Sequence, residues 1–194
     1  RLTGAEALVR RIKPDGTIIS PIDFIPVYEK SGLISRLDRY IWEQAAAKLG
    51  EWKKAGINMS ISVNISPKDF YYIDIFNTFA GLIKKYDIEP SNLKIEITET
   101  TIMSDVPNLM GELEELRKAG FTLEMDDFGS GYSSLNTLKD INVDVLKVDM
   151  GFIKETKNVK KSRIILASVI KMAKELNLLI ITEGVETEEQ VDNL

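Results

Sequence analysis

The sequence predicts an α/β protein whose parallel strands close into a barrel with helices on the outside. Apolar runs rich in β-branched residues alternate with amphipathic stretches, the polar residues in these runs recur at regular intervals, and each run has one apolar and one polar face. The 194 residues, of which 44% are hydrophobic, suffice for one substantial core. We therefore expect one domain over residues 1–194.

The elements follow in order along the chain. The predicted strands are residues 60–66, 93–98, 122–127, 144–149 and 178–184. Two stripes of apolar residues at helical spacing predict helices, namely Ile34, Leu37, Ile41, Ala45 and Leu49, and then Leu109, Leu113 and Leu116. Polar residues of successive strands are 32, 30, 21 and 36 residues apart, starting from Asn64. A βα unit takes roughly 30 residues, so this interval indicates alternating strands and helices around a parallel sheet.

The two faces of each strand decide between an open and a closed sheet. Ile61, Val63 and Ile65 share one face, whereas Ser62 and Asn64 lie on the other. An open sheet with helices on both sides would be apolar on both faces, so one polar face indicates a barrel. Functional residues of such barrels lie near the carboxyl ends of the strands. The polar residues near these predicted ends are Asn64, Glu96, Asp126, Asp127, Lys147 and Glu183.

Composition excludes several kinds of chemistry. The chain has no cysteine and no histidine, which removes disulfides, thiolate nucleophiles, Cys/His zinc sites and Ser-His-Asp triads. Its net charge of −5, from 30 acidic and 25 basic residues, argues against binding to a DNA or RNA duplex. No apolar run reaches the roughly 20 residues of a membrane span, and Arg1 begins no signal peptide. We expect a cytoplasmic fragment, whose parent protein can carry a membrane anchor outside these residues.

Asp126 and Asp127 stand next to each other, directly after an apolar run. Carboxylates that converge on one rim repel one another unless a cation binds between them. Because every candidate donor is an oxygen, Mg²⁺ or Mn²⁺ is favoured. Adjacent residues of a strand point to opposite faces, so both aspartates reach one site only if the strand ends there and residues 128–131 turn. Two ions held in this way suit hydrolysis at phosphorus.

A set of short motifs resembles the EAL family of cyclic di-GMP phosphodiesterases. In family order they are "EAL" (6–8), "PIDFIPVYEKSGLI" (21–34), "VNIS" (63–66), "EITE" (96–99), "DDFGSGYSSL" (126–135), "LKVD" (146–149) and "EGVET" (183–187). The resemblance covers nearly the whole chain and implies a modified (β/α)8 TIM-like barrel with one antiparallel strand. The family's leading Gln-Pro-Ile strand and closing Gly-Tyr strand are absent. We therefore expect residues 1–194 to be an EAL phosphodiesterase domain that is apparently truncated at both ends.

The resemblance implies the metal ligands and the catalytic residues. One ion is implied to bind Glu6, Asn64, Glu96 and Asp126, and the second ion Asp126, Asp127 and Glu183. Lys147 is implied to hold the attacking water, with either Glu183 or a metal-bound hydroxide accepting the proton, and we favour the hydroxide. Glu99 is implied to anchor residues 128–135 and so to couple the site to dimerisation.

The resemblance also implies residues that bind the substrate. Arg10 contacts a phosphate, Leu8 belongs to the same substrate-binding motif, and Asp149 and Glu186 orient the neighbours of Lys147. Arg11 stands where the family often has an aromatic residue, which leaves the guanine or phosphate contacts open. Several of these residues can instead have a purely structural role. Asn64 can cap a turn, Lys147 can be a counter-ion, Glu99 and Glu186 can be solvated, and Trp42 and Trp52 can be packing residues.

The function expected from the resemblance is metal-dependent hydrolysis of cyclic di-GMP to the linear dinucleotide pGpG. The alternative is a catalytically silent receptor domain that binds cyclic di-GMP and signals to a partner, and a third possibility is a metal-dependent lyase or sugar-acid enzyme on the same barrel. We expect a homodimer, with sensor or diguanylate cyclase domains upstream in the parent protein. Activity should rise into the alkaline range, because no histidine titrates near neutrality.

Overall fold

The computed structural model describes residues 2–128, 138–139, 141–149 and 159–185. The chain divides into two compact units, which are described separately. The N-terminal unit comprises Arg1–Glu96 and Ser104–Thr122, and the C-terminal unit comprises Ile97–Met103 and Leu123–Leu194. The main sheet has the strand order β1-β4-β5-β6-β7-β8, and the strand pairs described in it are parallel.

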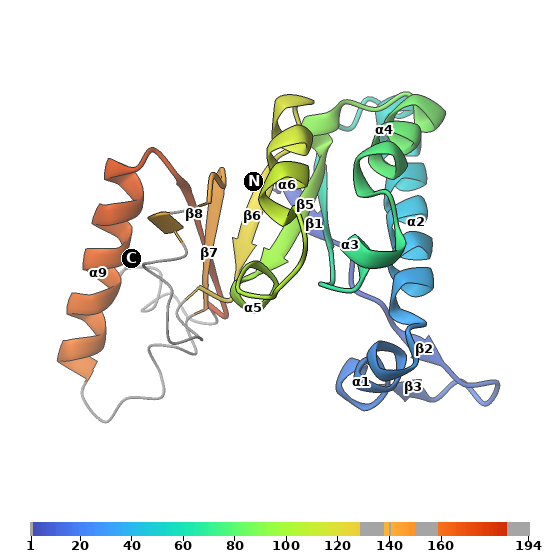
Figure 1. The fold of residues 1–194 in the computed structure, drawn as a ribbon, viewed down its shortest axis with the longest axis horizontal. Coiled ribbons are helices and arrows are strands. Elements are labelled where there is room, and N and C mark those ends of the chain that lie inside the picture. Colours follow the sequence, from blue (N-terminus) through green and yellow to red (C-terminus); the bar gives the residue numbers. More distant parts are fainter. Residues whose placement is uncertain (1, 129–137, 140, 150–158, 186–194) are drawn as a thin grey trace. The chain divides into compact units, whose positions relative to one another are not determined.

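The N-terminal unit contains the first strands of the sheet and most of the helices. Its sheet strands are β1 (Gly4–Glu6), β4 (Ser60–Asn64) and β5 (Leu93–Thr98), the last two residues of which belong to the C-terminal unit. Its helices are α1 (Pro21–Ser31), α2 (Ile34–Lys54), α3 (Asp69–Tyr72), α4 (Ile75–Tyr86) and α6 (Leu109–Lys118), with a 3₁₀ turn, η1 (Pro90–Asn92). Figure 1 places α2 and α4 alongside each other.

The core of this unit is built around α2. The ring of Trp42 is fully buried and lies 4.9 Å from that of Phe79 on α4, and Phe79 meets Phe121 edge-on at 5.7 Å. Such aromatic contacts stabilise a core beyond the area that they bury. The predicted stripe on α6 is buried as expected. Gly120, at φ 94°, follows the end of α6 in the left-handed conformation that glycine adopts without strain.

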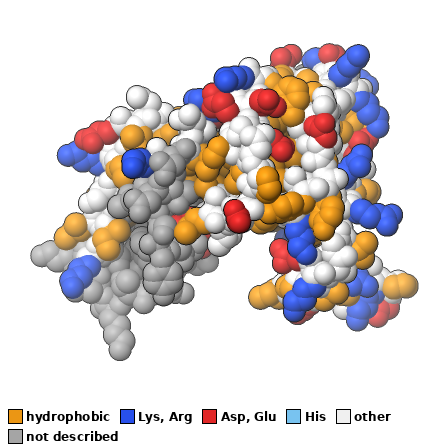
Figure 2. Space-filling model, in the orientation of Figure 1, with side chains coloured by type: hydrophobic (Ala, Val, Ile, Leu, Met, Phe, Trp, Pro, Cys, Tyr) orange, Lys and Arg blue, Asp and Glu red, His pale blue; other side chains and the backbone are white. Residues whose placement is uncertain are grey.

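A short hairpin and α1 form a separate segment of the N-terminal unit. The hairpin strands β2 (Arg11–Ile12) and β3 (Ile18–Ile19) are antiparallel. Pro21 begins α1, where a missing amide hydrogen costs nothing, and Gly32 follows its end at φ 74°. The segment carries exposed hydrophobic side chains, part of the orange surface in Figure 2, namely Ile12, Ile18, Ile22 and Val27.

The C-terminal unit contains the rest of the described sheet. Its elements are α5 (Glu99–Ile102), β6 (Leu123–Asp126), β7 (Val145–Asp149), α9 (Val159–Glu175) and β8 (Leu179–Glu183). Along β7 and β8, Lys147 lies opposite Ile181, and Asp149 lies opposite Glu183. The register therefore brings the polar ends of the two strands to the same edge. No helix among the described residues of the chain is long and apolar enough to cross a membrane.

The α/β fold class predicted from the sequence is confirmed. The five predicted strands are β4 to β8, with ends within two residues of those expected. Three side chains on the predicted polar face are buried, since Glu96, Glu124 and Lys147 are each exposed by 3% or less. The antiparallel strand implied by the resemblance is not among the described pairs of the main sheet and stays a prediction.

Strand β1 and the hairpin were not predicted from the sequence pattern. Gly4–Glu6 has three residues, and each hairpin strand has two. Alternation needs about four residues to be recognised, so strands this short carry no periodic signal. Glu6, which by itself suggests a helix, instead ends a strand.

Candidate active site

In the N-terminal unit, three predicted metal ligands come from three neighbouring strands. Glu6 ends β1, Asn64 ends β4, and Glu96 lies in β5 directly opposite Asn64. The Asn64 side-chain amide donates a hydrogen bond to Glu6 Oε1 over 3.2 Å. We call these three residues the oxygen-donor group. The structure thus brings together the ligands of this unit that the resemblance implied.

The end of β4 is held from two sides. The indole N–H of Trp42 on α2 donates to the main-chain carbonyl of Asn64 over 2.9 Å. On the other side, the amide of Ile65 donates to the carbonyl of Glu96 over 3.0 Å. Trp42 is a core residue, as expected, and Trp52 is half-buried. The contact of Trp42 with Asn64 was not predicted, because it depends on the distance between a helix and a strand end that are far apart in sequence.

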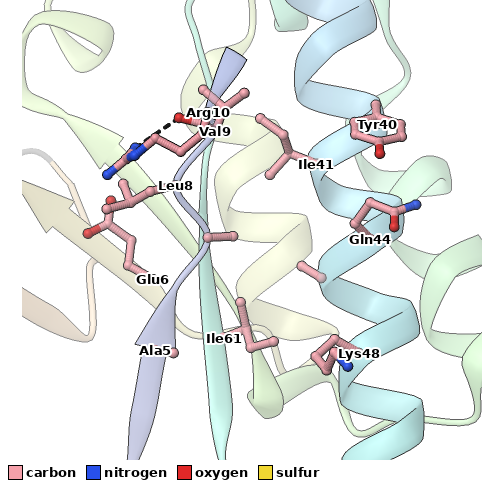
Figure 3. Close-up of a pocket in the computed structure, with 12 residues that line it drawn as sticks. Ala5, Glu6, Leu8, Val9, Arg10, Tyr40, Ile41, Gln44, Lys48 and Ile61 are labelled. Carbon is pink, nitrogen blue, oxygen red and sulfur yellow. Dashed lines mark hydrogen bonds between the residues drawn. The ribbon is translucent and has the colours of Figure 1, made fainter. Parts of the chain in front are cut away.

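The predicted substrate residues Leu8 and Arg10 follow β1. Together with Glu6 they line a cavity of about 340 Å³, which α2 borders with Tyr40 and Gln44 (Figure 3). The Arg10 guanidinium donates to the carbonyl of Val9 over 2.8 Å, and the side chains of both predicted residues are exposed. Their placement beside a predicted metal ligand suits contact with an anionic ligand, and their substrate role stays a prediction.

In the C-terminal unit, the chain turns directly after β6. Asp126 is the last residue of the strand, and Asp127 has a left-handed backbone with φ 56°. Aspartate adopts this conformation more readily than most residues. The amide of Asp127 donates to Asp126 Oδ1 over 2.9 Å, and the amide of Phe128 donates to the carbonyl of Lys147 over 3.3 Å. The strand therefore ends between the two aspartates, as their expected shared site requires.

Lys147 lies between two carboxylates of the neighbouring strands. Its ammonium is 2.8 Å from Glu183 Oε1 on β8 and 3.4 Å from Asp126 Oδ1 on β6. The lysine is buried, whereas Glu183 is partly open to solvent. Attraction to two carboxylates offsets the cost of removing this ammonium from water. We call Asp126, Lys147 and Glu183 the lysine cluster.

Other predicted residues of this unit have less defined surroundings. Glu99 is buried at the start of α5, where the Thr98 hydroxyl accepts a hydrogen bond from the Thr101 amide over 3.2 Å. Asp149 is exposed at the end of β7. Glu186 and the loop residues 129–135 lie outside the described part of the chain, so the predicted roles of Glu186 and of the Glu99-anchored loop are not tested.

The donor chemistry suits a hard divalent cation, although the described side chains do not form a complete metal site. Among the described residues, no three Asp, Glu, His or Cys side chains gather in a way that could hold a metal ion. What each unit brings together is a set of oxygen donors, as Mg²⁺ and Mn²⁺ require. The oxygen-donor group would hold an ion in one unit, and Asp126, Asp127 and Glu183 would hold one in the other. Asp126, which the resemblance assigns to both ions, belongs to the C-terminal unit.

Comparison with known proteins decides the family. The EAL domain model matches residues 1–194. This chain belongs to the EAL domain family. It is 38% identical over 200 residues to the probable cyclic di-GMP phosphodiesterase PdeG of Escherichia coli, covering 100% of the chain and 38% of that protein. It is 35% identical over 194 residues to the bifunctional diguanylate cyclase/cyclic di-GMP phosphodiesterase MucR of Pseudomonas aeruginosa, covering 100% of the chain and 28% of MucR.

A solved structure supports the same fold. The phosphodiesterase of MucR, in a complex with cyclic di-GMP, superposes with a TM-score of 0.88 at 35% identity, covering 97% of this EAL domain chain and 77% of that one. The chain spans less than two fifths of the length of PdeG and less than a third of MucR. The activity of the whole protein is therefore a matter of proposal.

Proposed function

We propose that this EAL domain hydrolyses cyclic di-GMP to the linear dinucleotide pGpG with the help of two Mg²⁺ or Mn²⁺ ions. The observation that carries the proposal is the lysine cluster, in which a buried ammonium lies between carboxylates of two neighbouring strands. A lysine that is buried between carboxylates at the ends of strands is typical of a functional site. Relatives named as cyclic di-GMP phosphodiesterases support the choice of substrate.

Each group of residues has a separate task in the proposed reaction. Lys147 orients the attacking water and stabilises negative charge that develops nearby. The oxygen-donor group would hold one divalent ion, and Asp126, Asp127 and Glu183 would hold the other, with Asp126 as the ligand that the resemblance assigns to both ions. Bound ions of this kind polarise the phosphate and stabilise the attacking and leaving oxygens. Arg10 binds a phosphate of the substrate through its guanidinium.

The parent protein is proposed to be a larger cytoplasmic signalling protein in which this domain dimerises and receives a signal from sensor or diguanylate cyclase domains. PdeG and MucR are both much longer than this chain. Under this proposal, residues 1–194 are the phosphodiesterase domain of that protein.

Incubation of the purified protein with cyclic di-GMP and Mn²⁺, followed by chromatography of the products, tests the proposal. We expect pGpG to accumulate, and we expect Lys147→Met to abolish it. Lys171→Met, which changes an exposed lysine of α9, should leave turnover unchanged. Binding of cyclic di-GMP without product would favour the silent receptor. Neither binding nor turnover, in a folded protein that takes up Mn²⁺, would favour a lyase or sugar-acid enzyme.

A further inference from the structure

A pair of buried carboxyl groups in the N-terminal unit has no part in the proposed reaction. Asp38 lies on α2 and is 8% exposed, and Asp69 begins α3 and is fully buried. Acidic residues are rarely buried to this degree unless they are paired or protonated. The two residues are 31 positions apart in the sequence, so the fold alone brings them together.

The hydrogen bonds of Asp69 leave one oxygen for Asp38. Asp69 Oδ2 accepts from the amide of Ser66 over 2.8 Å and from its hydroxyl over 3.0 Å, which closes the turn before α3. Asp69 Oδ1 is buried and accepts no hydrogen bond from the described residues. Helix α2, which carries Asp38, packs against α3, which Asp69 begins, and Asp38 interacts with the side chain of Asp69. Two ionised carboxylates only accept, so a hydrogen bond between them requires a proton on one of them.

The charges around Asp38 favour its protonated form. Burial, the charge of Asp69 and the hydrogen bond to Asp69, in this order, raise the pKa of Asp38 to about 8, although a hydrogen bond with the Ser66 side chain lowers it, and Glu29 on α1 adds to the rise. The nearest lysine in the sequence to this pair, Lys68, donates instead to the main-chain carbonyl of Glu29.

The other elements packed against α2 supply no opposing charge to Asp38. Lys85 on α4 binds Glu43, and β4 contains no charged residue. None of the interactions found for Asp38 among the described residues comes from a lysine or an arginine. Since no basic side chain neutralises this pair, a bound proton is the positive charge that can do so.

We propose that Asp38 and Asp69 share one proton and that this carboxyl pair fastens α2 to the turn that follows Asn64. Asp38 and Trp42 are four residues apart and so lie on the same face of the helix. Trp42 holds the carbonyl of Asn64, and Asp38 holds the turn closed by Ser66 and Asp69. Asp38 and Asp69 are thus positioning residues for Asn64. This positioning role rests on the proposed function, whereas the shared proton does not.

Infrared spectroscopy tests the shared proton directly. A difference spectrum between the wild type and each variant isolates the carbonyl band of this pair from the bands of the other carboxyl groups. We expect the wild type at about pH 7 to show the carbonyl stretch of a protonated carboxylic acid, and we expect Asp38→Asn to lack it. Glu29→Gln, which removes a nearby charge and leaves the pair in place, should keep the band. Loss of the band in both variants, or its absence in the wild type, would overturn the proposal.

The stability of the protein as a function of pH gives a second measurement. Asp38 keeps its proton up to about pH 8 when folded, but only to about pH 3.8 when unfolded. Between pH 3.8 and about pH 8 the folded state binds one proton more than the unfolded state at Asp38. The stability of the protein therefore falls as the pH rises through this range, and Asp38 causes no further change above it. Relative to wild type, Asp38→Asn should gain up to about tenfold in folding equilibrium constant per pH unit within this range.

A second variant keeps the proposal testable if Asp38→Asn does not fold. Asp69→Asn removes the charge of Asp69 but leaves Asp38 buried, so it should give a relative gain with pH that is smaller than that of Asp38→Asn. A cation in place of the proton would appear as stabilisation of the wild type, but not of Asp38→Asn, by Na⁺ or K⁺ at constant ionic strength. That result would overturn the shared proton.

Binding of Mn²⁺ tests the positioning role separately. Asp38→Leu, which cannot hydrogen-bond, should weaken the affinity by about tenfold, whereas Asp38→Asn, which donates an N–H in place of the O–H, should stay close to wild type. Equal affinity for Mn²⁺ in all three proteins would overturn the positioning role and leave the shared proton standing. Uptake of Mn²⁺ without hydrolysis of cyclic di-GMP would count against the proposed function alone.

Discussion

Replacing Lys147 with methionine should destabilise the protein, because it removes the ammonium from the lysine cluster and leaves two carboxylates facing each other. Methionine has a similar length and is apolar, so it fills the buried space that the lysine stem occupies. The loss of stability should therefore reflect the missing positive charge more than any change in packing. We expect the variant to fold, with a lower melting temperature than the wild type.

The size of the effect follows from the two distances. At 2.8 Å and 3.4 Å, with an effective dielectric constant of about 20, the attractions are about 6 and 5 kcal/mol before desolvation is counted. Desolvation of the ammonium offsets much of this sum, and the Glu183 side chain is 36% exposed, which weakens the attraction further. We expect a net loss of about 3 kcal/mol in the free energy of unfolding. For a chain of this length, that corresponds to a decrease of roughly 6–12 °C in Tm.

Thermal unfolding followed by circular dichroism, at low salt and with EDTA present, measures this loss. Lys171→Met is the matched control, because Lys171 forms an exposed pair with Glu175 at 3.9 Å on α9. This pair should contribute less than about 0.5 kcal/mol. A decrease in Tm for Lys147→Met no larger than that of the control would refute the electrostatic role of Lys147. In the same buffer without EDTA, addition of Mn²⁺ should raise the Tm of Lys147→Met more than that of the wild type, since the two carboxylates of the variant lack a cation.

Three further predictions concern other parts of the chain. Trp42→Phe keeps a ring against Phe79 but loses the hydrogen bond to Asn64, so denaturant unfolding should give a loss of about 1 kcal/mol, and an unchanged midpoint would count against that bond. The side-chain hydrogen bond from Lys85, and then that from Tyr86, lower the pKa of Glu43, so its contribution to stability is present above the unfolded pKa of about 4.5 and is lost as the pH falls through the lower folded value. Glu43→Gln should accordingly lower the Tm at about pH 7 by more than it does under acidic conditions, and equal losses across the acidic range would contradict this linkage. Calcium should bind without supporting hydrolysis, because it prefers longer bonds and more ligands than Mg²⁺, and equal turnover with the two ions would exclude that view.

The sequence predicted those parts of the fold and the candidate site that have a periodic or local signal. Strands β4 to β7 alternate apolar and polar residues over four or more positions, and β8 is an apolar run that ends at Glu183, so the strands and their ends could be assigned. The turn between Asp126 and Asp127 was predictable because two adjacent acids cannot serve one site from a straight strand. Strand β1 was too short to produce such a signal.

The buried Asp38 was missed for a different reason. The predicted apolar stripe on α2 included Leu37 and Ile41, but these are only half-buried, whereas Asp38 and Trp42 are buried. The deeper face of the helix is therefore rotated toward Ser35, Asp38 and Trp42, which are three and four residues apart. A polar residue one turn before a core tryptophan is the signal that could have indicated it. Its partner Asp69 could not have been identified, because no pattern in the sequence measures the distance between two separate helices.

The central lysine of the cluster also bears on how the domain assembles. A chain that needs an ion to neutralise its acids stays unfolded until that ion arrives, as small zinc-binding domains do. Here Lys147 supplies a positive charge from within the chain, at 2.8 Å from Glu183. The carboxylates of the lysine cluster consequently have a counter-charge before any divalent ion binds, so this part of the domain can fold when divalent ions are scarce.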